Sequence, residues 1–110
     1  MKYRLKIKEL INNWESWSKK IAQASKSILG ECKVYVFGSA IKNECVGGSD
    51  IDILIIKNTI PNKKSLRAEI IVKIEDKAGL PLYHPFEIHL VNEEEAKWYF
   101  KHIDKFIQIM

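Results

Sequence analysis

The sequence has 110 residues, of which 46% are hydrophobic and 29% are charged. This is the size of one small domain with the composition of an ordinary globular protein, which excludes a disordered chain or a bundle of membrane spans. The formal net charge of +4 would suit a polyanionic ligand, but outside residues 2–8 the lysines are scattered, so charge alone identifies no partner.

The cysteines and the hydropathy of the chain indicate the cellular compartment in which we expect the protein. Cys32 and Cys45 stand in no spacing typical of a metal or redox site. The chain contains neither an apolar segment long enough to span a membrane nor a signal peptide with a hydrophobic centre. We therefore expect a single domain over residues 1–110, located in a reducing cytoplasm and not in a membrane.

The N-terminal third of the chain has helical periodicity. Apolar residues recur there at intervals of three, four or seven and predict a helix over residues 5–29. These residues are Leu10, Trp14, Trp17, Ile21 and Ile28. Gly30 follows them and can take the left-handed conformation that ends a helix.

Two short strands come next. Residues 33–37 are rich in β-branched and aromatic side chains and predict a strand that Gly38–Ser39 closes. A short helix over residues 40–46 and a loop at Gly47–Gly48 lead to a second strand over residues 50–56. The far end of this second strand is apolar on both faces, which is typical of a strand covered on each side.

The C-terminal half predicts a helix, a strand and a last helix. The helix covers residues 63–78 and stops at Gly79, and the strand covers residues 86–91. Asn92 and Glu95 then form the pattern of a capping box at the start of the last helix. The apolar side of that helix is made of Ala96, Tyr99, Ile103, Phe106 and Met110.

These elements predict an α/β (α+β) domain with a small mixed sheet of three or more strands flanked by helices. The short connection between the first two strands favours an antiparallel pair. The longer helical crossover to the third strand favours a parallel, right-handed connection. The start of the third strand, with Glu87, is therefore expected at the same sheet edge as Asp50 and Asp52.

Asp50 and Asp52 are the first candidate site residues. Aspartate is disfavoured in strands, and alternation places both side chains on one face of an otherwise apolar strand. Two such carboxylates repel each other, and a hard divalent cation would relieve that repulsion. The alternative is a solvent-exposed strand start, which the aspartates alone do not exclude.

The segment upstream favours the ligand-binding interpretation. Gly38 lets the backbone approach a ligand closely, and a helix that starts at Ser39 would offer free N–H groups to phosphate oxygens. Ser39 can also cap that helix or donate its hydroxyl to the same phosphates. With Asp50, Asp52 and Glu87, three carboxylates and one phosphate-binding turn converge on one sheet edge.

This constellation resembles the nucleotidyltransferase superfamily typified by DNA polymerase β. The matching parts are Gly38–Ser39, then ten residues, then Asp50–Ile51–Asp52, and the later strand carboxylate in Phe86–Glu87–Ile88. Ser49, directly before the first aspartate, is also similar to the family. At this length the chain looks like the stand-alone minimal nucleotidyltransferases (MNT), which are often paired with a helical HEPN-domain protein in prokaryotic toxin–antitoxin systems.

The resemblance implies transfer of a nucleoside monophosphate, with ATP as the expected donor, to an acceptor hydroxyl. In the family, the three carboxylates at the positions of Asp50, Asp52 and Glu87 hold two Mg²⁺ ions, and the third also helps to deprotonate the acceptor. The Gly-Ser turn holds the β- and γ-phosphates. We assign Ser49 and Lys42 to nucleotide binding as well, although Lys42 has an alternative as a solvated side chain. Glutamate at position 87 departs from the aspartate that is more usual in the family and has a longer reach.

Other polar and aromatic residues have simpler interpretations. His84 is expected to be a loop residue, and His89, on the same face as Glu87, a hydrogen-bonded structural histidine. Trp14 and Trp17 are expected in the core or in a subunit interface.

The alternative to an enzyme is a binding subunit that keeps a nucleotide-binding fold and acts on a partner by contact. The chain has no room for an acceptor-recognition domain, and its terminal helices carry more aromatic surface than one small sheet needs. We therefore expect a partner, either a second copy of the chain or a helical HEPN-type protein whose hydroxyl is the acceptor. Nucleic acid is a less favoured partner, because no RNA-binding motif is found.

Overall fold

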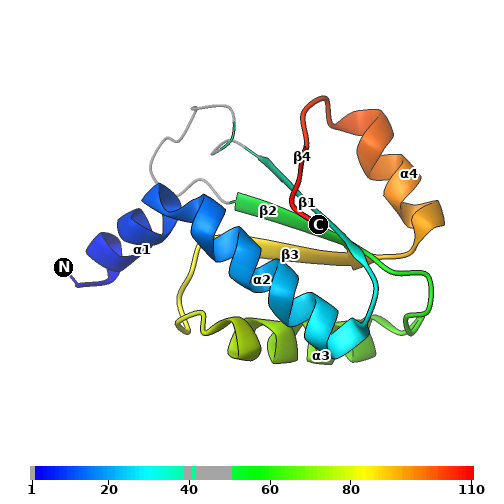
Figure 1. The fold of residues 1–110 in the computed structure, drawn as a ribbon, viewed down its shortest axis with the longest axis horizontal. Helices are drawn as coiled ribbons and strands as arrows, with labels where there is room; N and C mark the ends of the chain where they lie inside the picture. The colour runs from blue at the N-terminus through cyan, green and yellow to red at the C-terminus, as the bar shows by residue number, and fades with distance from the viewer. Residues whose placement is uncertain (1, 39–40, 42–50) are drawn as a thin grey trace.

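A computed structural model describes residues 2–38, 41 and 51–110, with side chains from residue 7 onward (Figure 1). The elements are, in chain order, α1 (Lys2–Asn12), α2 (Trp14–Leu29), β1 (Lys33–Gly38), β2 (Ile51–Ile56), α3 (Lys64–Ala78), β3 (Phe86–Val91), α4 (Glu93–His102) and β4 (Ile107–Gln108).

One mixed sheet organises the chain, with the strand order β3-β2-β1-β4. β1 and β2 are antiparallel, and β2 and β3 are parallel, as the lengths of their connections predict. The central register pairs Val36 of β1 with Ile53 of β2, and Ile53 with Ile88 of β3. The predicted fold class is therefore confirmed, and the sheet has one strand more than the three that the sequence identifies.

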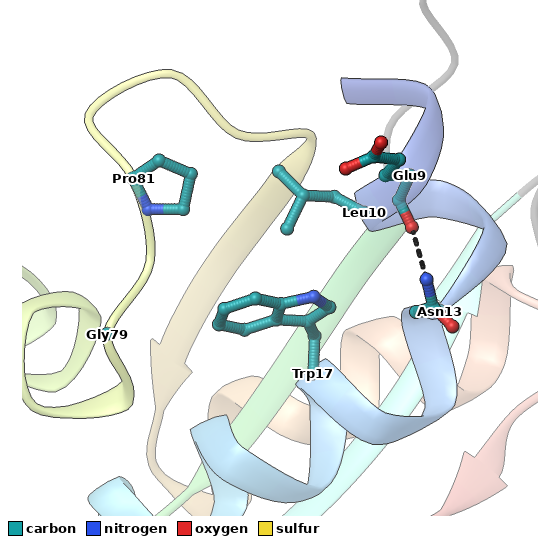
Figure 2. A pocket seen from close by; sticks show the side chains of 6 residues that line it. All are labelled: Glu9, Leu10, Asn13, Trp17, Gly79 and Pro81. Atoms are coloured by element: carbon teal, nitrogen blue, oxygen red, sulfur yellow. Dashed lines mark hydrogen bonds between the residues drawn. The ribbon is translucent and has the colours of Figure 1, made fainter. Parts of the chain in front are cut away.

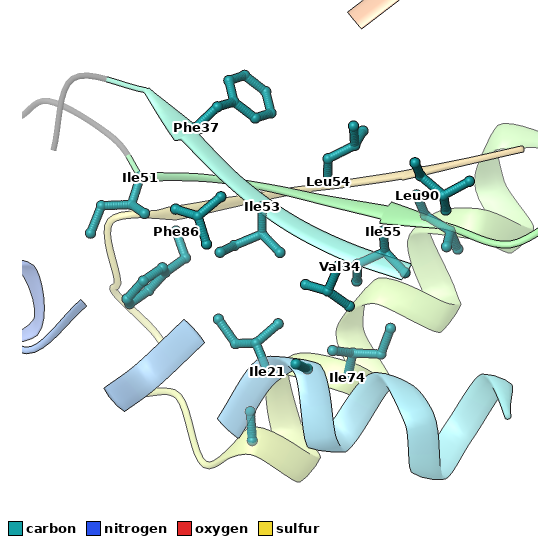
Figure 3. Packing of buried hydrophobic residues seen from close by; sticks show 14 of the residues in the cluster. Ile21, Val34, Phe37, Ile51, Ile53, Leu54, Ile55, Ile74, Phe86 and Leu90 are labelled. Carbon is teal, nitrogen blue, oxygen red and sulfur yellow. The ribbon is translucent and has the colours of Figure 1, made fainter. Parts of the chain in front are cut away.

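The main core lies between one face of the sheet and the pair of helices α2 and α3. Figure 3 shows Val34, Ile53 and Ile55 pointing toward Ile21 of α2 and Ile74 of α3, and all five are fully buried. Burying a side chain of this size stabilises the fold by roughly 1.5–3 kcal/mol relative to leaving it exposed. Ile53 and Ile55 of β2 are held toward the helices by this apolar layer. Because successive side chains of a strand point to opposite faces, Asp52 points to the face of the sheet away from α2 and α3.

The opposite face of the sheet is covered by α4 and the C-terminal segment. Phe37 and Leu54 project from this face (Figure 3), and both are buried. The ring of Phe37 lies 6.1 Å from that of Tyr99 in α4 and 5.1 Å from that of Phe106. The strand β2 is therefore apolar on both faces beyond Asp52, as its sequence predicts.

The predicted N-terminal helix is broken into two. α1 ends at Asn12 and α2 begins at Trp14, because Asn13 leaves the helical conformation with φ −109° and ψ 29°. The side chain of Asn13 donates to the carbonyl oxygen of Glu9 at 2.9 Å, the kind of local bond with which asparagine competes against helix. At the other end Gly30 takes the positive φ of 79°, although its ψ of −148° lies outside the left-handed helical region.

A small hollow lies between the junction of α1 and α2 and the segment that follows α3. Figure 2 shows Glu9 and Leu10 of α1 on one side of it and Pro81 on the other, with the ring of Trp17 below. The pocket has a volume of about 320 Å³. Trp14 and Trp17 pack against the core while staying partly exposed, in agreement with the predicted core role.

The prediction that the last helix continues to Met110 is wrong. α4 ends at His102, Ile103 is already extended, and Ile107–Gln108 form β4 beside β1. Val34 N–H donates to the carbonyl oxygen of Met110 at 2.6 Å, and Ile109 N–H donates to that of Val34 at 2.8 Å. Pairing with β1 satisfies backbone groups that an edge strand would otherwise leave open.

The remaining boundaries agree with the sequence. α3 stops at Gly79, which adopts the left-handed conformation with φ 77° and ψ 23°. The predicted capping box of α4 is present: Glu95 N–H donates to Asn92 Oδ1 at 2.8 Å, and Asn92 N–H donates to Glu95 Oε1 at 3.0 Å. None of the helices in the described part of the chain combines the length and hydropathy that crossing a bilayer requires.

Candidate functional site

Asp52 and Glu87 lie side by side at the end of the sheet where the strands β2 and β3 begin. They are register partners on the parallel strands β2 and β3, so both side chains project from the face that α4 covers in part. One carboxylate oxygen of each lies within 4.8 Å of the other and of a ring nitrogen of His89. Asp52 is half-buried and Glu87 is exposed. Oxygen donors this close together suit a hard divalent cation such as Mg²⁺.

The entry into β3 is anchored before Glu87 is reached. Ile51 N–H donates to the carbonyl oxygen of Pro85 at 2.8 Å, which starts the parallel pairing of β2 and β3. His84 Nδ1 accepts from Phe86 N–H at 3.1 Å, and its Nε2 bonds the carboxylate of Glu75 in α3. The predicted loop residue His84 therefore has a structural role, because it ties the start of β3 to α3.

His89 is hydrogen-bonded, as predicted, and one of its partners is a candidate site residue. Its Nε2 lies 3.0 Å from Asp52 Oδ1, and its Nδ1 lies 3.3 Å from the hydroxyl oxygen of Tyr99. Burial of Tyr99 in this region raises the pKa of its hydroxyl, and the nearby carboxylates of Glu95, Glu87 and Asp52 raise it further. A tyrosine hydroxyl is in any case protonated at neutral pH, so Tyr99 can donate a hydrogen bond.

Aromatic rings cover one side of this group. The Phe37 ring, on the register partner of Asp52 in β1, lies 5.6 Å from the His89 ring. The Tyr99 ring lies 5.4 Å from His89 on the side of α4. Asp52 thus has an apolar wall on one side and the more exposed Glu87 on the other. An apolar wall lowers the local dielectric constant and strengthens the attraction between a carboxylate and a cation.

The predicted phosphate-binding residues are only partly described. Gly38 ends β1 with φ 109°, a conformation that side chains rarely adopt, and it pairs with Ile51 next to the aspartate segment. Its backbone is thus close to the start of β2. The other predicted site residues, Ser39, Lys42, Ser49 and Asp50, lie outside the described residues. So does the predicted short helix over residues 40–46, apart from Ile41.

Sequence reasoning missed Tyr99 as a member of this group and did not connect His89 with Asp52. The alternation that places His89 on the face of Glu87 is visible in the sequence. The contact with Tyr99 depends on how α4 packs across the sheet, which no local pattern specifies.

Comparison with known proteins agrees with this fold. Residues 18–108 match the model of a family described as a nucleotidyltransferase domain. No curated protein matches the sequence. Among solved structures, one described as a candidate nucleotidyltransferase superposes with a TM-score of 0.65 at 24% identity, over 84% of this chain and 96% of that one. A second, a candidate nucleotidyltransferase from Sulfolobus solfataricus, superposes with a TM-score of 0.66 at 19% identity, over 91% of this chain and 82% of that one. These two likenesses concern the fold, whereas the family match covers most of the sequence. The chain belongs to the nucleotidyltransferase domain family.

Proposed function

We propose that this protein transfers a nucleoside monophosphate, AMP from ATP in the first instance, to a hydroxyl group of a partner protein. The observation that carries the proposal is the pairing of Asp52 with Glu87 across two parallel strands, in a chain of the nucleotidyltransferase family. Both carboxylates lie at the edge where the chain leaves Gly38 and enters β2.

The site residues would divide the work of the reaction. Asp50, Asp52 and Glu87 would hold two Mg²⁺ ions, which when bound stabilise the charge on the attacking and leaving oxygens. Glu87 would take the proton of the acceptor hydroxyl, whose oxygen then bonds to the α-phosphorus. The bond from that phosphorus to the bridging oxygen breaks, and pyrophosphate leaves. Gly38 and Ser39, with Ser49 and Lys42 beside them, would hold the triphosphate so that the leaving group stays in line.

The acceptor is proposed to lie on a partner, either a HEPN-type helical protein of a toxin–antitoxin pair or a second copy of the chain. Trp98 and Phe100 of α4 are 56% and 43% exposed, which is high for large apolar side chains. Phe100 also contacts Tyr35, with ring centroids 5.2 Å apart, and so joins this surface to the face of the sheet that carries Asp52. A partner docked on α4 would therefore adjoin the face of the sheet that carries the carboxylates.

A second candidate function is that of a non-catalytic, nucleotide-binding antitoxin subunit. The observation that favours it is the side chain at position 87, where glutamate is one methylene longer than the aspartate that the family resemblance leads one to expect. Such a subunit would still bind nucleotide and its partner without transferring the nucleotide.

Incubation with labelled nucleoside triphosphates, Mg²⁺ and the product of the neighbouring gene tests both candidates. The expected result is a label on the partner that depends on ATP, on Mg²⁺ and on the two aspartates. The control is the double variant Asp50→Asn/Asp52→Asn, which should transfer nothing. Binding of ATP and partner without any transfer, from any of the common triphosphates, would support the binding subunit instead.

A further inference from the structure

We propose that His89 is a positioning residue for Asp52: its Nε2–H fixes one carboxylate oxygen, leaving the other for a metal ion, and the Tyr99 hydroxyl holds the imidazole in place. This inference rests on the proposed function of Asp52 as a metal ligand. It adds two residues, one on β3 and one on α4, to the three carboxylates.

The geometry of the three side chains forms a continuous hydrogen-bonded chain. His89 Nε2 lies 3.0 Å from Asp52 Oδ1, and the hydroxyl oxygen of Tyr99 lies 3.3 Å from His89 Nδ1. His89 sits opposite Leu54 in the register of the parallel strands, one pleat beyond the pair of Asp52 and Glu87. It therefore reaches Asp52 diagonally across the same face of the sheet.

The direction of each hydrogen bond follows from the chemistry of the groups. An ionised carboxylate only accepts hydrogen bonds, so His89 Nε2 must carry the hydrogen that points at Asp52. In a neutral imidazole the other nitrogen, Nδ1, is then an acceptor, and the Tyr99 hydroxyl donates to it.

The imidazole ring is also held by packing. Phe37 lies 5.6 Å from it at an interplanar angle of 32°, and Tyr99 lies 5.4 Å from it at 61°. The side chains of His89 and Asp52 are only 21% and 20% exposed. The imidazole ring therefore has little room to turn. Its hydrogen bond to Asp52 restricts the rotation of the carboxylate as well.

A carboxylate with a fixed orientation binds a metal ion more tightly than one that turns freely. Mg²⁺ demands near-ideal ligand geometry, and groups that bond to a metal ligand typically change metal affinity or activity by about 10- to 100-fold when removed. Glu87 is exposed, so Asp52 is the better held of the two described carboxylates. His89 would thus fix the orientation of the Asp52 carboxylate. The side chain of the more exposed Glu87 would then move to complete the metal site.

The test follows the binding of Mn²⁺ together with ATP by electron paramagnetic resonance, against the spectrum of Mn²⁺–ATP without protein, so that it does not depend on transfer. His89→Leu removes the donor at similar volume and should weaken Mn²⁺ binding about 10- to 100-fold. His89→Gln keeps an N–H donor toward Asp52 and should stay within a few-fold of wild type. Tyr99→Phe should weaken binding a few-fold in the wild type and have no further effect in the His89→Leu background, because both residues act through one chain.

Two controls accompany these variants. His102→Leu changes an exposed histidine of α4 outside the site and should bind Mn²⁺ as wild type does. Thermal unfolding without metal should show that every variant is folded, which separates lost positioning from lost structure.

Several results would overturn the inference. Wild-type Mn²⁺ binding in His89→Leu would show that His89 positions nothing. Equally weak binding in His89→Gln and His89→Leu would show that an N–H donor toward Asp52 is not what His89 contributes. Additive effects of Tyr99→Phe and His89→Leu would remove Tyr99 from the chain. If the wild type fails to bind Mn²⁺ with ATP, both the inference and the proposed metal site fall. If binding behaves as expected but no acceptor is ever labelled, only the proposed transfer falls.

Discussion

Arg67 Nη1, in the first turn of α3, lies 2.9 Å from both carboxylate oxygens of Glu95 in the first turn of α4. The same guanidinium donates to the carbonyl oxygens of Pro61 and Leu90, at 2.6 and 3.3 Å. One side chain thus joins the start of α3, the end of β3 and the start of α4. Because α4 carries Tyr99, this ion pair helps to hold the helix that lies against the candidate site.

The ion pair should make stability depend on pH in the acid range. The hydrogen bond from Arg67, and next the one from the Asn92 N–H, lower the pKa of Glu95 from its ordinary value of 4.5. A lowered folded-state pKa gives stability that is fully present above the ordinary value and is lost as pH falls through the folded-state value.

Glu95→Gln should therefore lower the free energy of unfolding at neutral pH by about 1 kcal/mol or less, since the pair is partly exposed. The difference from wild type should shrink below pH 4.5. Urea titrations at a series of pH values measure it. A difference that stays constant down to the lowest pH would show that the charge of Glu95 is not its cause.

Glu87→Gln should lower the rate of nucleotide transfer by about 100-fold or more, since it removes both a metal-binding charge and a base. The side chain is exposed and its shape is nearly unchanged, so the melting temperature should not move. The matched control is Glu94→Gln, which changes an exposed glutamate of α4 outside the site. This variant should transfer at the wild-type rate. Unchanged transfer in Glu87→Gln would remove this residue from the site.

Asp50→Asn/Asp52→Asn should leave the metal-free protein as stable as wild type or more stable, because two like charges are relieved. The asparagine at position 52 still offers an oxygen to the His89 N–H. Mg²⁺ with ATP at about 100 times Kd should stabilise the wild type by roughly 2.7 kcal/mol and leave the variant unchanged. Differential scanning fluorimetry measures both shifts, and equal shifts would place the metal elsewhere.

Ile74→Ala should destabilise the fold by about 2–5 kcal/mol, since this fully buried side chain fills the layer between α3 and the sheet. Val72→Ala on the same helix is the control. Val72 is 53% exposed, so its truncation should cost well under 1 kcal/mol. Chemical denaturation of both variants compares the two sites, and similar losses would mean that α3 is not seated on the sheet as described.

Trp98→Ala should weaken association with a partner while leaving the melting temperature nearly unchanged, because this side chain is mostly outside the core. Sedimentation of the pure protein, alone and with the neighbouring gene product, measures association. Lys97→Ala, at the adjacent exposed position, should have no effect. A wild-type protein that stays monomeric and ignores that product would leave the exposed aromatic surface without the proposed role.

The central part of the fold is predictable from the sequence because its signals are local and agree with one another. Residues 51–56 are apolar on nearly every position, and residues 86–91 have strand propensity, with a helical crossover between them. Connection length then dictates the parallel pairing that brings Asp52 beside Glu87. The candidate site is predictable to this extent because it follows from topology.

Both ends of the chain show where local signals fail. Ile103, Phe106 and Met110 have helical spacing, yet they lie in a segment that pairs with β1 and packs on Phe37. A strand of two residues is too short to show the alternation of apolar and polar side chains that identifies a strand in a sequence. At the other end, the apolar spacing on both sides of Asn13 continues through the break, which is marked by the non-helical φ and ψ of Asn13 and by the bond of its side chain to Glu9. The contact of Tyr99 with His89 likewise exists only once α4 has docked.

The pairing of β4 with β1 has a consequence for the order in which the protein can fold. β1 is synthesised early, and β2 can cover one of its edges soon afterwards, but the other edge waits for residues from the far end of the sequence. Contacts between such distant segments form slowly, because most of the chain must first be closed into a loop. Until then Val34 and its neighbours present an open strand edge that other chains could extend. Shortening the segment after α4 should therefore increase aggregation during synthesis, even where the finished α2–α3 core remains intact.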